Sequence, residues 1–297
     1  RKRGFDAVES VLPRTAGGGG LTKAQQARRR VTAAVAGAGF VEVISLPFMG
    51  DADLDHLGLD AEDPRRATVK LANPLDDTHP YLRTTLLPGL IEAAGRQALA
   101  CQCDITSPDS IAAMASDVQK KFGRCDILIN CAGIYPQRAF DDMTFEDWRR
   151  VLSINLDSCF LVSKQFVPGM KQRNWGRIVN MASSTLGSVV TGFVHYMSSK
   201  AGIVGFTRAM ASELGAYGIT VNAISPGLTR SPGTLARKPR PGMADMEAEF
   251  NFAAGMQAIK RVEEPDDLVG TVSYLTSDDA AFITGQTLNV DGGRVRS

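Results

Sequence analysis

The most informative reactive side chains in this sequence are a serine, a tyrosine and a lysine with regular spacing. Tyr196 and Lys200 are four residues apart in a stretch with a helical pattern, so they should share one face of a helix. Ser183 comes thirteen residues before Tyr196, at the expected end of a strand. A free tyrosine titrates near pH ~10, and a neighbouring ammonium lowers such a pKa by about 1 to 3 pH units because it favours the phenolate. A phenol beside an ammonium is therefore a candidate for acid–base chemistry near neutral pH.

Each of these residues also has a purely structural explanation. Tyr196 could keep its hydroxyl in water, Lys200 could be a solvated surface lysine, and Ser183 could cap a turn. Asn155 is expected inside a helix, where asparagine is mildly unfavourable, and this favours a specific role. His195 adjoins Tyr196 but should point elsewhere, since neighbouring helical residues do not share a face.

The elements that would position these residues alternate regularly between strand and helix. The expected strands are "ALACQC" (98–103), "DILIN" (126–130), "RIVNMAS" (177–183), "ITVNAIS" (219–225) and "QTLNV" (286–290). The expected helices cover 107–123, 144–170, 195–218 and 264–277. Ser107 with Pro108 should begin the first helix, and Thr144 with Asp147 the second. The pattern predicts an α/β fold whose parallel sheet is covered on both faces, with "DILIN" buried on both sides.

Further polar positions fall at the same edge of this sheet. "NCAG" (130–133) ends one strand, and "NAISPGLT" (222–229) leaves another through a Pro-Gly turn. Ligands of open parallel sheets bind outside the carboxyl ends of the strands. We therefore expect the site at this edge.

Together these features resemble the short-chain dehydrogenase/reductase family over residues 96–297. The resemblance rests on Ser183, the Tyr-x-x-x-Lys pair, the "NCAG" and Pro-Gly turns and the closing "ITGQTLNVDGG". Three segments, "FGRCDILINCAGIYP", "FVPGMKQRNWGRIVN" and "SDDAAFITGQTLNVDGG", are most similar to the bacterial 1-phenylethanol dehydrogenase type. The implied fold is a Rossmann-like, doubly wound parallel sheet.

The resemblance also implies roles for the residues. Tyr196 would be the general acid/base, Lys200 would lower its pKa and hold the nicotinamide ribose, and Ser183 would bind the substrate carbonyl. Asn155 would anchor a water that links Lys200 to solvent. Thr229 would contact the nicotinamide amide. The implied cofactor-binding positions are Asp104 (at a strand end, meeting the adenine), Asn130, Ala132, Gly133, Tyr196, Lys200, Pro226, Gly227 and Thr229. The cofactor would be NAD, with NADP not excluded, and the assembly a homo-tetramer.

The segment 229–260 is the expected substrate lid. Its apolar residues are Met243, Met246, Phe250, Phe252 and Met256. They could close an apolar pocket over an aromatic or bulky ketone or secondary alcohol, or they could belong to an ordinary core-facing helix.

The first 95 residues do not continue the pattern. Four glycines (17–20) precede a helix expected over 23–39, but they follow "VLPRTA" and not a strand, so residues 1–22 are interpreted as a flexible linker. "FVEVISL" (40–46) and "ATVKLA" (67–72) are expected strands, and "TTLLPGLIEAAG" (84–95) an interrupted helix. "LANPL" and "LRTTLLPGL" resemble the bacterial phenylalanyl-tRNA synthetase β subunit over residues 4–95. That resemblance implies an α+β, non-catalytic fragment and a possible synthetase α subunit as partner.

The part that resembles the short-chain dehydrogenases therefore lacks the first elements of that family's fold. The family's first strand and its Thr-Gly-x-x-x-Gly-x-Gly turn are missing, and that strand would be central in the sheet. "FVEVISL" or "ATVKLA" could fill the gap, but neither supplies the phosphate-binding turn, so cofactor affinity should fall. We interpret the chain as a fusion of two partial domains, joined near residue 96.

Composition sets the remaining limits. The 297 residues are 44% hydrophobic and 22% charged, with a net charge of +1, which argues against bulk electrostatic binding of nucleic acid. Residues 1–30 carry eight Lys and Arg, read as a solvated helix face with a tail, or else as a tRNA or membrane contact. Five cysteines without zinc spacing indicate a reduced, cytoplasmic chain without a metal site. No apolar run is long enough to cross a membrane.

Overall fold

The chain divides into two units, Arg1–Ala100 and Cys101–Ser297. The computed structural model describes residues 48–49, 66, 68–70, 81–82, 99, 101–240 and 242–296. In the first unit, β1 (Phe48–Met49) and β2 (Val69–Lys70) pair antiparallel with β3 (Tyr81–Leu82) on its two sides.

This small sheet corrects one expectation. The described part of "ATVKLA" pairs with Tyr81–Leu82, so it does not fill the gap in the parallel sheet. The other expectations for this region lie outside the described residues: the linker 1–22 with its four glycines, the strand 40–46, and the helices 23–39 and 84–95.

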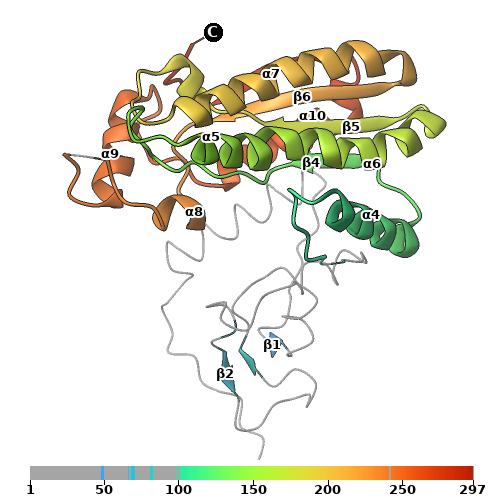
Figure 1. The fold of residues 1–297 in the computed structure, drawn as a ribbon, viewed down its shortest axis with the longest axis horizontal. Helices are drawn as coiled ribbons and strands as arrows, with labels where there is room; N and C mark the ends of the chain where they lie inside the picture. Colours follow the sequence, from blue (N-terminus) through green and yellow to red (C-terminus); the bar gives the residue numbers. More distant parts are fainter. Residues whose placement is uncertain are drawn as a thin grey trace, which may run out of the picture. The chain divides into compact units, whose positions relative to one another are not determined.

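The second unit contains the expected parallel sheet, drawn in Figure 1. Its strands are β4 (Ile127–Asn130), β5 (Gly176–Met181), β6 (Ile219–Pro226) and β7 (Thr287–Val290), in that spatial order. In the register, Asn130 lies opposite Asn180, and Ala223 lies opposite both Asn180 and Thr287. All neighbouring pairs are parallel, so the carboxyl ends of the strands meet at one edge.

The four helices expected in this unit are present, although the one expected over 144–170 is divided by a π-helical turn and the one expected over 195–218 ends at Leu214. They are α4 (Pro108–Phe122), α5 (Phe145–Leu152), α6 (Ser158–Arg173), α7 (Val194–Leu214), α8 (Pro232–Leu235), α9 (Met246–Met256) and α10 (Asp266–Thr276). Ser107 caps α4, accepting from Ser110 N, and Thr144 with Asp147 forms a reciprocal capping box at α5. These helix starts confirm the sequence-based predictions.

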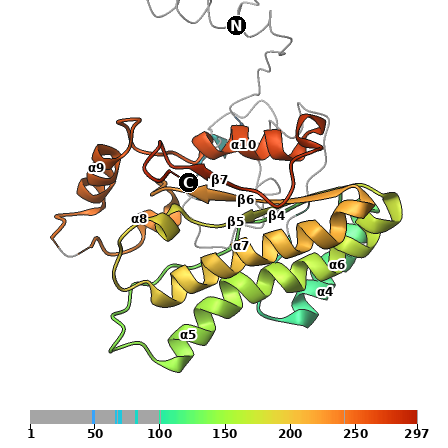
Figure 2. The same ribbon diagram turned by 90° about the horizontal axis from the view of Figure 1, so that it is seen from above.

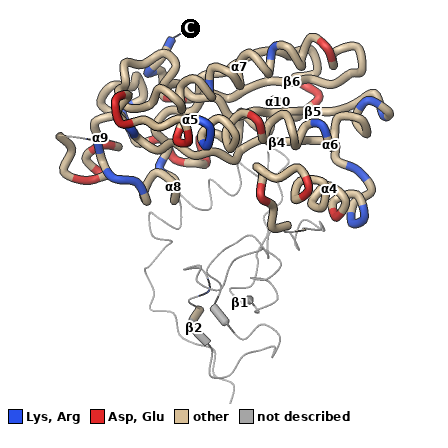
Figure 3. The backbone as a smooth tube through the Cα atoms, in the orientation of Figure 1, with Lys and Arg blue, Asp and Glu red and all other residues tan. Residues whose placement is uncertain are grey.

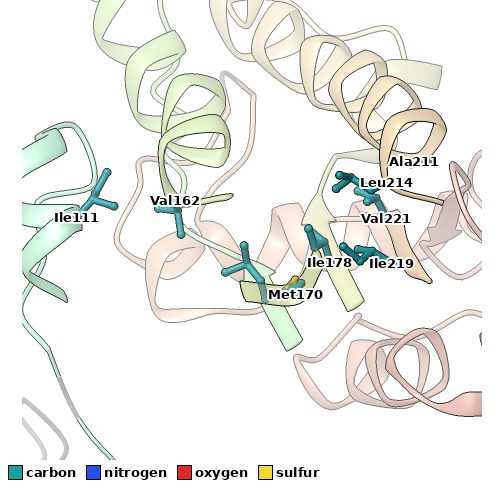
Figure 4. Packing of buried hydrophobic residues seen from close by; sticks show 9 residues of the cluster. Ile111, Val162, Met170, Ile178, Ala211, Leu214, Ile219 and Val221 are labelled. Carbon is teal, nitrogen blue, oxygen red and sulfur yellow. The ribbon is translucent and has the colours of Figure 1, made fainter. Parts of the chain in front are cut away.

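Helices cover both faces of the parallel sheet, as Figure 2 shows. On one face, Ile111, Met170 and Leu214 from three helices pack with Ile178 and Val221 of the sheet (Figure 4). On the other face, Leu275 of α10 packs against Val179 and Ile224. This is the layered, doubly wound arrangement expected from the alternating pattern.

Two expectations at the β4 side are wrong. The described residues of "ALACQC" form no strand, because none of the described strands pairs with them and an unpaired strand leaves its backbone groups without partners. "DILIN" forms β4 but is not buried on both faces: Ile127 is 44% and Ile129 43% exposed, while Leu128 is buried. The register places Ile129 beside Val179, on the α10 face. Among the described elements none covers this part of that face.

Candidate functional site

A cavity of about 370 Å³ lies at the carboxyl edge of the sheet. Its walls come from the segments that follow β5 and β6, from α7, and from the segment around α8 and α9. The residues with proposed catalytic roles that line it are Ser183, Tyr196 and Lys200. The strand ends therefore bring together three side chains that are separated along the chain.

Ser183 is a turn cap as well as a cavity residue. It follows β5 in extended conformation and begins a short 3₁₀ turn, Ser184–Gly187. Its Oγ accepts from Thr185 N at 3.3 Å and from Thr185 Oγ1 at 2.9 Å. Its hydroxyl also acts on Tyr196, whose pKa it lowers by hydrogen bonding. The capping interpretation and the functional one are thus compatible, since the cap fixes the hydroxyl beside the phenol.

Tyr196, in the first turn of α7, is held between two aromatic rings. Tyr135 and Phe193 contact it edge-on, with ring centroids 6.2 Å and 6.0 Å away. Burial raises the pKa of Tyr196, although the hydrogen bond from Ser183 opposes this. The direction is opposite to the expected lowering: burial dominates, Tyr135 adds to it, and Lys200 is not among the groups that shift this pKa in the protein alone.

Lys200 is buried, not a solvated surface residue. Its Nζ lies 5.7 Å from the centroid of the Tyr196 ring, which confirms the expected shared helix face. The same Nζ donates to Met181 O at 2.6 Å, at the end of β5. Burial lowers the pKa of Lys200 to about 8, while Cys159 and Cys131 oppose the shift. A buried amine with one backbone partner is an unusual arrangement for a merely structural lysine.

Asn155 lies in a π-helical turn, Ser153–Asp157, that joins α5 to α6. It is fully buried. Its Oδ1 accepts from Ile134 N at 2.8 Å, and its Nδ2 donates to Ile134 O at 2.9 Å and to Ser199 Oγ at 3.0 Å. The amide thus fastens the turn after β4 to α7, beside Lys200. The sequence indicated a helix here but not the π turn, a feature that often marks functional sites.

The "NCAG" turn contains residues with different surroundings. Asn130 Nδ2 donates to Asn180 Oδ1 at 2.8 Å, and Asn180 Nδ2 donates to Thr207 Oγ1 at 2.9 Å. This chain ties β4 through β5 to α7, so Asn130 is first a structural link. Gly133 lines the cavity and Ala132, which is exposed, does not.

The turn after β6 is held by a carboxylate that the sequence did not single out. Glu263 Oε1 accepts from Thr229 Oγ1 at 2.6 Å, and Oε2 accepts from Gly227 N at 3.0 Å. Glu263 is buried, and burial raises its pKa. Pro226, Gly227 and Thr229 all line the cavity. The local sequence pattern could not predict this role of Glu263, because its partners Gly227 and Thr229 are more than thirty residues away along the chain.

Asp104 does not end a strand, contrary to expectation. It is exposed, and its Oδ1 accepts from Thr106 N at 2.9 Å and Thr106 Oγ1 at 2.7 Å. These bonds lower the pKa of Asp104. Its carboxylate shapes the turn that leads into α4 and does not line the cavity.

The lid segment contributes polar groups and not the expected apolar ones. None of the five named methionines and phenylalanines lines the cavity, and Met246 and Phe250 are buried in the core. The segment instead presents Arg237, Arg240 and Glu249. His195 is fully buried, accepts from Tyr196 N and does not line the cavity, so the expectation that it points elsewhere is confirmed.

Two classes of site receive no support in the part of the chain that the structure describes. No three His, Cys, Asp or Glu side chains gather as metal ligands there. No described helix is long and apolar enough to cross a membrane.

Comparison with known proteins separates the two parts of the chain. Residues 8–102 match the family model described as phenylalanyl tRNA synthetase beta chain CLM domain. The phenylalanine–tRNA ligase beta subunit of Cutibacterium acnes is 67% identical over 93 residues, which are 31% of this chain and only 11% of that protein. This chain therefore carries a small part of a synthetase-like protein.

The larger part matches oxidoreductases. Residues 83–294 match the family model described as enoyl-(acyl carrier protein) reductase. The (2S)-[(R)-hydroxy(phenyl)methyl]succinyl-CoA dehydrogenase subunit BbsD of Thauera aromatica is 38% identical over 205 residues, 68% of this chain and 78% of that protein. A crystal structure assigned as a gluconate dehydrogenase from Agrobacterium tumefaciens superposes with a TM-score of 0.63 and 31% identity, over 70% of this chain and 80% of that one.

These findings confirm both resemblances seen in the sequence. The chain is a fusion of a phenylalanyl-tRNA synthetase β-like segment with an oxidoreductase of Rossmann-like fold. By its larger part, it belongs to the short-chain dehydrogenase/reductase family, whose members use nicotinamide cofactors.

Proposed function

We propose that this chain transfers a hydride between a nicotinamide cofactor and a secondary alcohol or ketone. The observation that carries the proposal is the meeting of Ser183, Tyr196 and Lys200 in one cavity at the carboxyl edge of the sheet. A bound nicotinamide supplies or accepts the hydride. The protein's part is to hold the substrate oxygen and to move one proton at that oxygen.

The surroundings of Tyr196 suit it to donate that proton. Because burial raises its pKa, the phenol is protonated at neutral pH and can give its proton to a ketone oxygen. Ser183, fixed by its bonds to Thr185, would hold the same oxygen. The ammonium of Lys200 would stabilise the phenolate that remains. Asn155 would keep a water in place that returns a proton to Lys200.

The residues of the cavity fit the nicotinamide-ribose end of the cofactor. A Cβ on Gly133 would lie 3.3 Å from Asn155 Oδ1, a tight contact, and 3.6 Å from Lys200 Nζ, so this turn passes close to both side chains. Lys200 donates one bond within the described residues and has further donors for ribose hydroxyls. Thr229 would contact the nicotinamide amide, with Pro226 and Gly227 shaping that wall.

The cavity residues do not supply a comparable site for the pyrophosphate of the cofactor. The sequence lacks the family's glycine-rich turn, so we propose weakened cofactor binding. At the β4 side, Asn130, Ala132 and Gly133 would border the cofactor, and Asp104 would contact the adenine. NAD is the proposed cofactor, with NADP as the alternative.

The body of the proposed substrate is aromatic or apolar. Val190, Phe193 and Leu228 contribute apolar wall to the cavity, together with Tyr135 and Leu268. The Thauera relative is named for a substrate with a phenyl group, which supports an aromatic substrate for the present chain. The five cysteines are free, which fits a reducing, cytoplasmic setting.

The proposed assembly is a homo-tetramer. Leu156, Phe160 and Phe206 line a second hollow where α6 and α7 meet, and Phe160 is 52% exposed. A second copy that packs on this apolar face would cover these rings. Light scattering of the purified chain tests the proposal.

A second candidate function belongs to the first unit. Its 67% identity to a synthetase β subunit over 93 residues favours a partner-binding fragment that docks a synthetase α subunit without catalysing aminoacylation. Pull-down of the α subunit by this chain tests the proposal. The same pull-down with residues 101–296 alone serves as the control.

The first experiment is an NADH titration followed by energy transfer from Trp148 and Trp175, and then turnover of acetophenone and 1-phenylethanol. Saturable binding with turnover supports the oxidoreductase. No binding up to millimolar NADH would mean that the chain does not bind the cofactor, which contradicts the proposed hydride transfer.

A further inference from the structure

The cavity that holds Tyr196 is positively charged at its outer wall. Arg237, Arg240 and Arg294 line it together with Lys200, and Glu249 is the one carboxylate among the described residues that line it. Figure 3 shows the cluster of basic residues on the segment between α8 and α9, which contributes two of the arginines. Four cations against one anion leave an unbalanced positive charge in a partly apolar cavity.

The first two arginines are held in place by a buried carboxylate. Glu249 of α9 is 1% exposed. Its Oε1 forms an ion pair with Arg237 Nη2 and accepts from Arg240 Nε at 2.7 Å. Its Oε2 accepts from Arg240 N at 2.9 Å, so the backbone at Arg240 is fixed as well as the side chain. Arg237 also donates from Nη1 to Lys238 O at 3.4 Å, whereas Arg240 keeps both terminal guanidinium nitrogens, Nη1 and Nη2, as donors for a ligand.

The third arginine comes from the other side and is positioned by a second buried carboxylate. Asp291 is 2% exposed, and it accepts from the backbone N–H groups of Gly293 at 3.0 Å, Arg294 at 3.1 Å and Val295 at 2.9 Å. This turn brings Arg294 to the cavity. Within the described residues its guanidinium has no ion pair.

Arg294 and Arg240 also repel each other. Burial and the charge of Arg240 lower the pKa of Arg294. The charge of Asp291 opposes this shift, and Arg240 shares Glu249 with Arg237. One buried carboxylate for two arginines, with Arg294 lining the same cavity, still leaves an excess of positive charge. A carboxylate placed between them would relieve the repulsion and accept paired hydrogen bonds.

We propose that Arg240 and Arg294 bind a carboxylate on the far end of the substrate, so that the natural substrate is a keto acid or hydroxy acid with an apolar body. The reacting oxygen would lie at Ser183 and Tyr196, and the carboxylate at the arginine pair. The inference rests on the proposed function for the reaction, but the anion site stands on its own geometry.

Binding of an unreactive probe pair tests the anion site without requiring turnover. Calorimetric titration of the full chain with 4-phenylbutanoate and with 4-phenylbutanamide compares an acid with its neutral counterpart of equal size. We expect the acid to bind about 10- to 100-fold more tightly, the usual range for a hydrogen-bonded charge pair. The preference should vanish in Arg294→Gln and be partly retained in Arg294→Lys. Arg296→Gln, an exposed neighbour that does not line the cavity, should leave it unchanged.

Three results would overturn the proposal: equal binding of acid and amide, an acid preference that survives in Arg294→Gln, or inorganic pyrophosphate binding more tightly than the acid. The last would assign the arginines to a cofactor phosphate. Failure of the proposed function gives a different result. The chain would then still bind the acid probe more tightly than the amide, but it would show no NADH-dependent turnover. If turnover is present, kcat/KM for 4-oxo-4-phenylbutanoate should exceed that for its methyl ester, and Arg294→Gln should remove the difference.

Discussion

Two regions of the same sheet differ sharply in burial and pairing: the carboxyl edge of β5 and β6, and the outer side of β4. At β5 and β6, nearly every residue is buried, and the strand ends lead directly to Ser183 and to the Pro226–Gly227 turn. At β4, Ile127 and Ile129 are exposed, and β4 pairs only with β5 among the described strands.

The difference follows from the missing beginning of the family fold. From the resemblance, that missing strand is expected to be central in the sheet, beside β4. Loss of this unit removes packing from β4 while the strands that carry the proposed catalytic residues stay between two packed helical layers. The proposed proton-transfer residues thus lie in the well-packed part of the sheet, and the proposed weakening of cofactor binding concerns the β4 side.

The largest expected effect is on the packed edge: Tyr196→Phe should reduce kcat for acetophenone reduction by about 100- to 10,000-fold, because the proton donor is removed. Thermal unfolding should change little, since the ring packing against Tyr135 and Phe193 is kept. Tyr217→Phe, on an exposed turn, is the matched control. A variant that keeps more than a tenth of the rate would assign the proton to another group.

A pair of truncations measures the difference between the two regions directly. Ile224→Ala in β6 removes a fully buried side chain and should cost about 2 to 5 kcal/mol of unfolding free energy. Ile129→Ala in β4, 43% exposed, should cost less than about 1 kcal/mol because water already reaches the site. Urea unfolding of both variants checks this, and equal losses would show that some part of the chain covers β4.

Lys200→Met should stabilise the fold by about 1 to 3 kcal/mol near pH 7 while it abolishes turnover, because a buried ammonium is replaced by an apolar chain of similar length. The sign follows from the pKa of about 8 in the folded chain. Below pH 8 Lys200 is charged in both the folded and the unfolded chain, so its burial costs most there. Between pH 8 and 10.5 folding releases the proton, and the gain from Lys200→Met shrinks as the pH rises through this range. Lys164→Met, exposed on α6, should show no such pH-dependent gain in urea unfolding. A destabilised Lys200→Met would mean that the bond to Met181 O outweighs the cost of burial.

Sequence reasoning located the elements and the residue triad because both depend on local order. Neighbouring residues determine the helix caps at Ser107 and Thr144 and the alternation of strands and helices. The pairing of Tyr196 with Lys200 follows from helical spacing alone.

The parts that were missed depend on contacts between distant segments. Glu263 meets Thr229, and Asn180 joins Asn130, only once the sheet edge is assembled. The exposure of Ile129 was not predicted from "DILIN", because a short apolar run does not report which elements pack against it. The raised pKa of Tyr196 is set by burial, which local spacing does not report.

The smallest expected effect is on the β4 side, at Asp104. Its carboxylate is already engaged by Thr106, so an adenine contact has only the unused oxygen available. We expect Asp104→Ala to weaken NADH binding by about two- to tenfold and to leave kcat unchanged, as for one exposed hydrogen bond. Asp109→Ala, in the first turn of α4, controls for effects on the helix start. A loss well beyond tenfold in NADH affinity, measured by the tryptophan energy-transfer titration, would show that the β4 side carries much of the cofactor site despite its incomplete packing. No loss at all would confine cofactor binding to the cavity around Lys200.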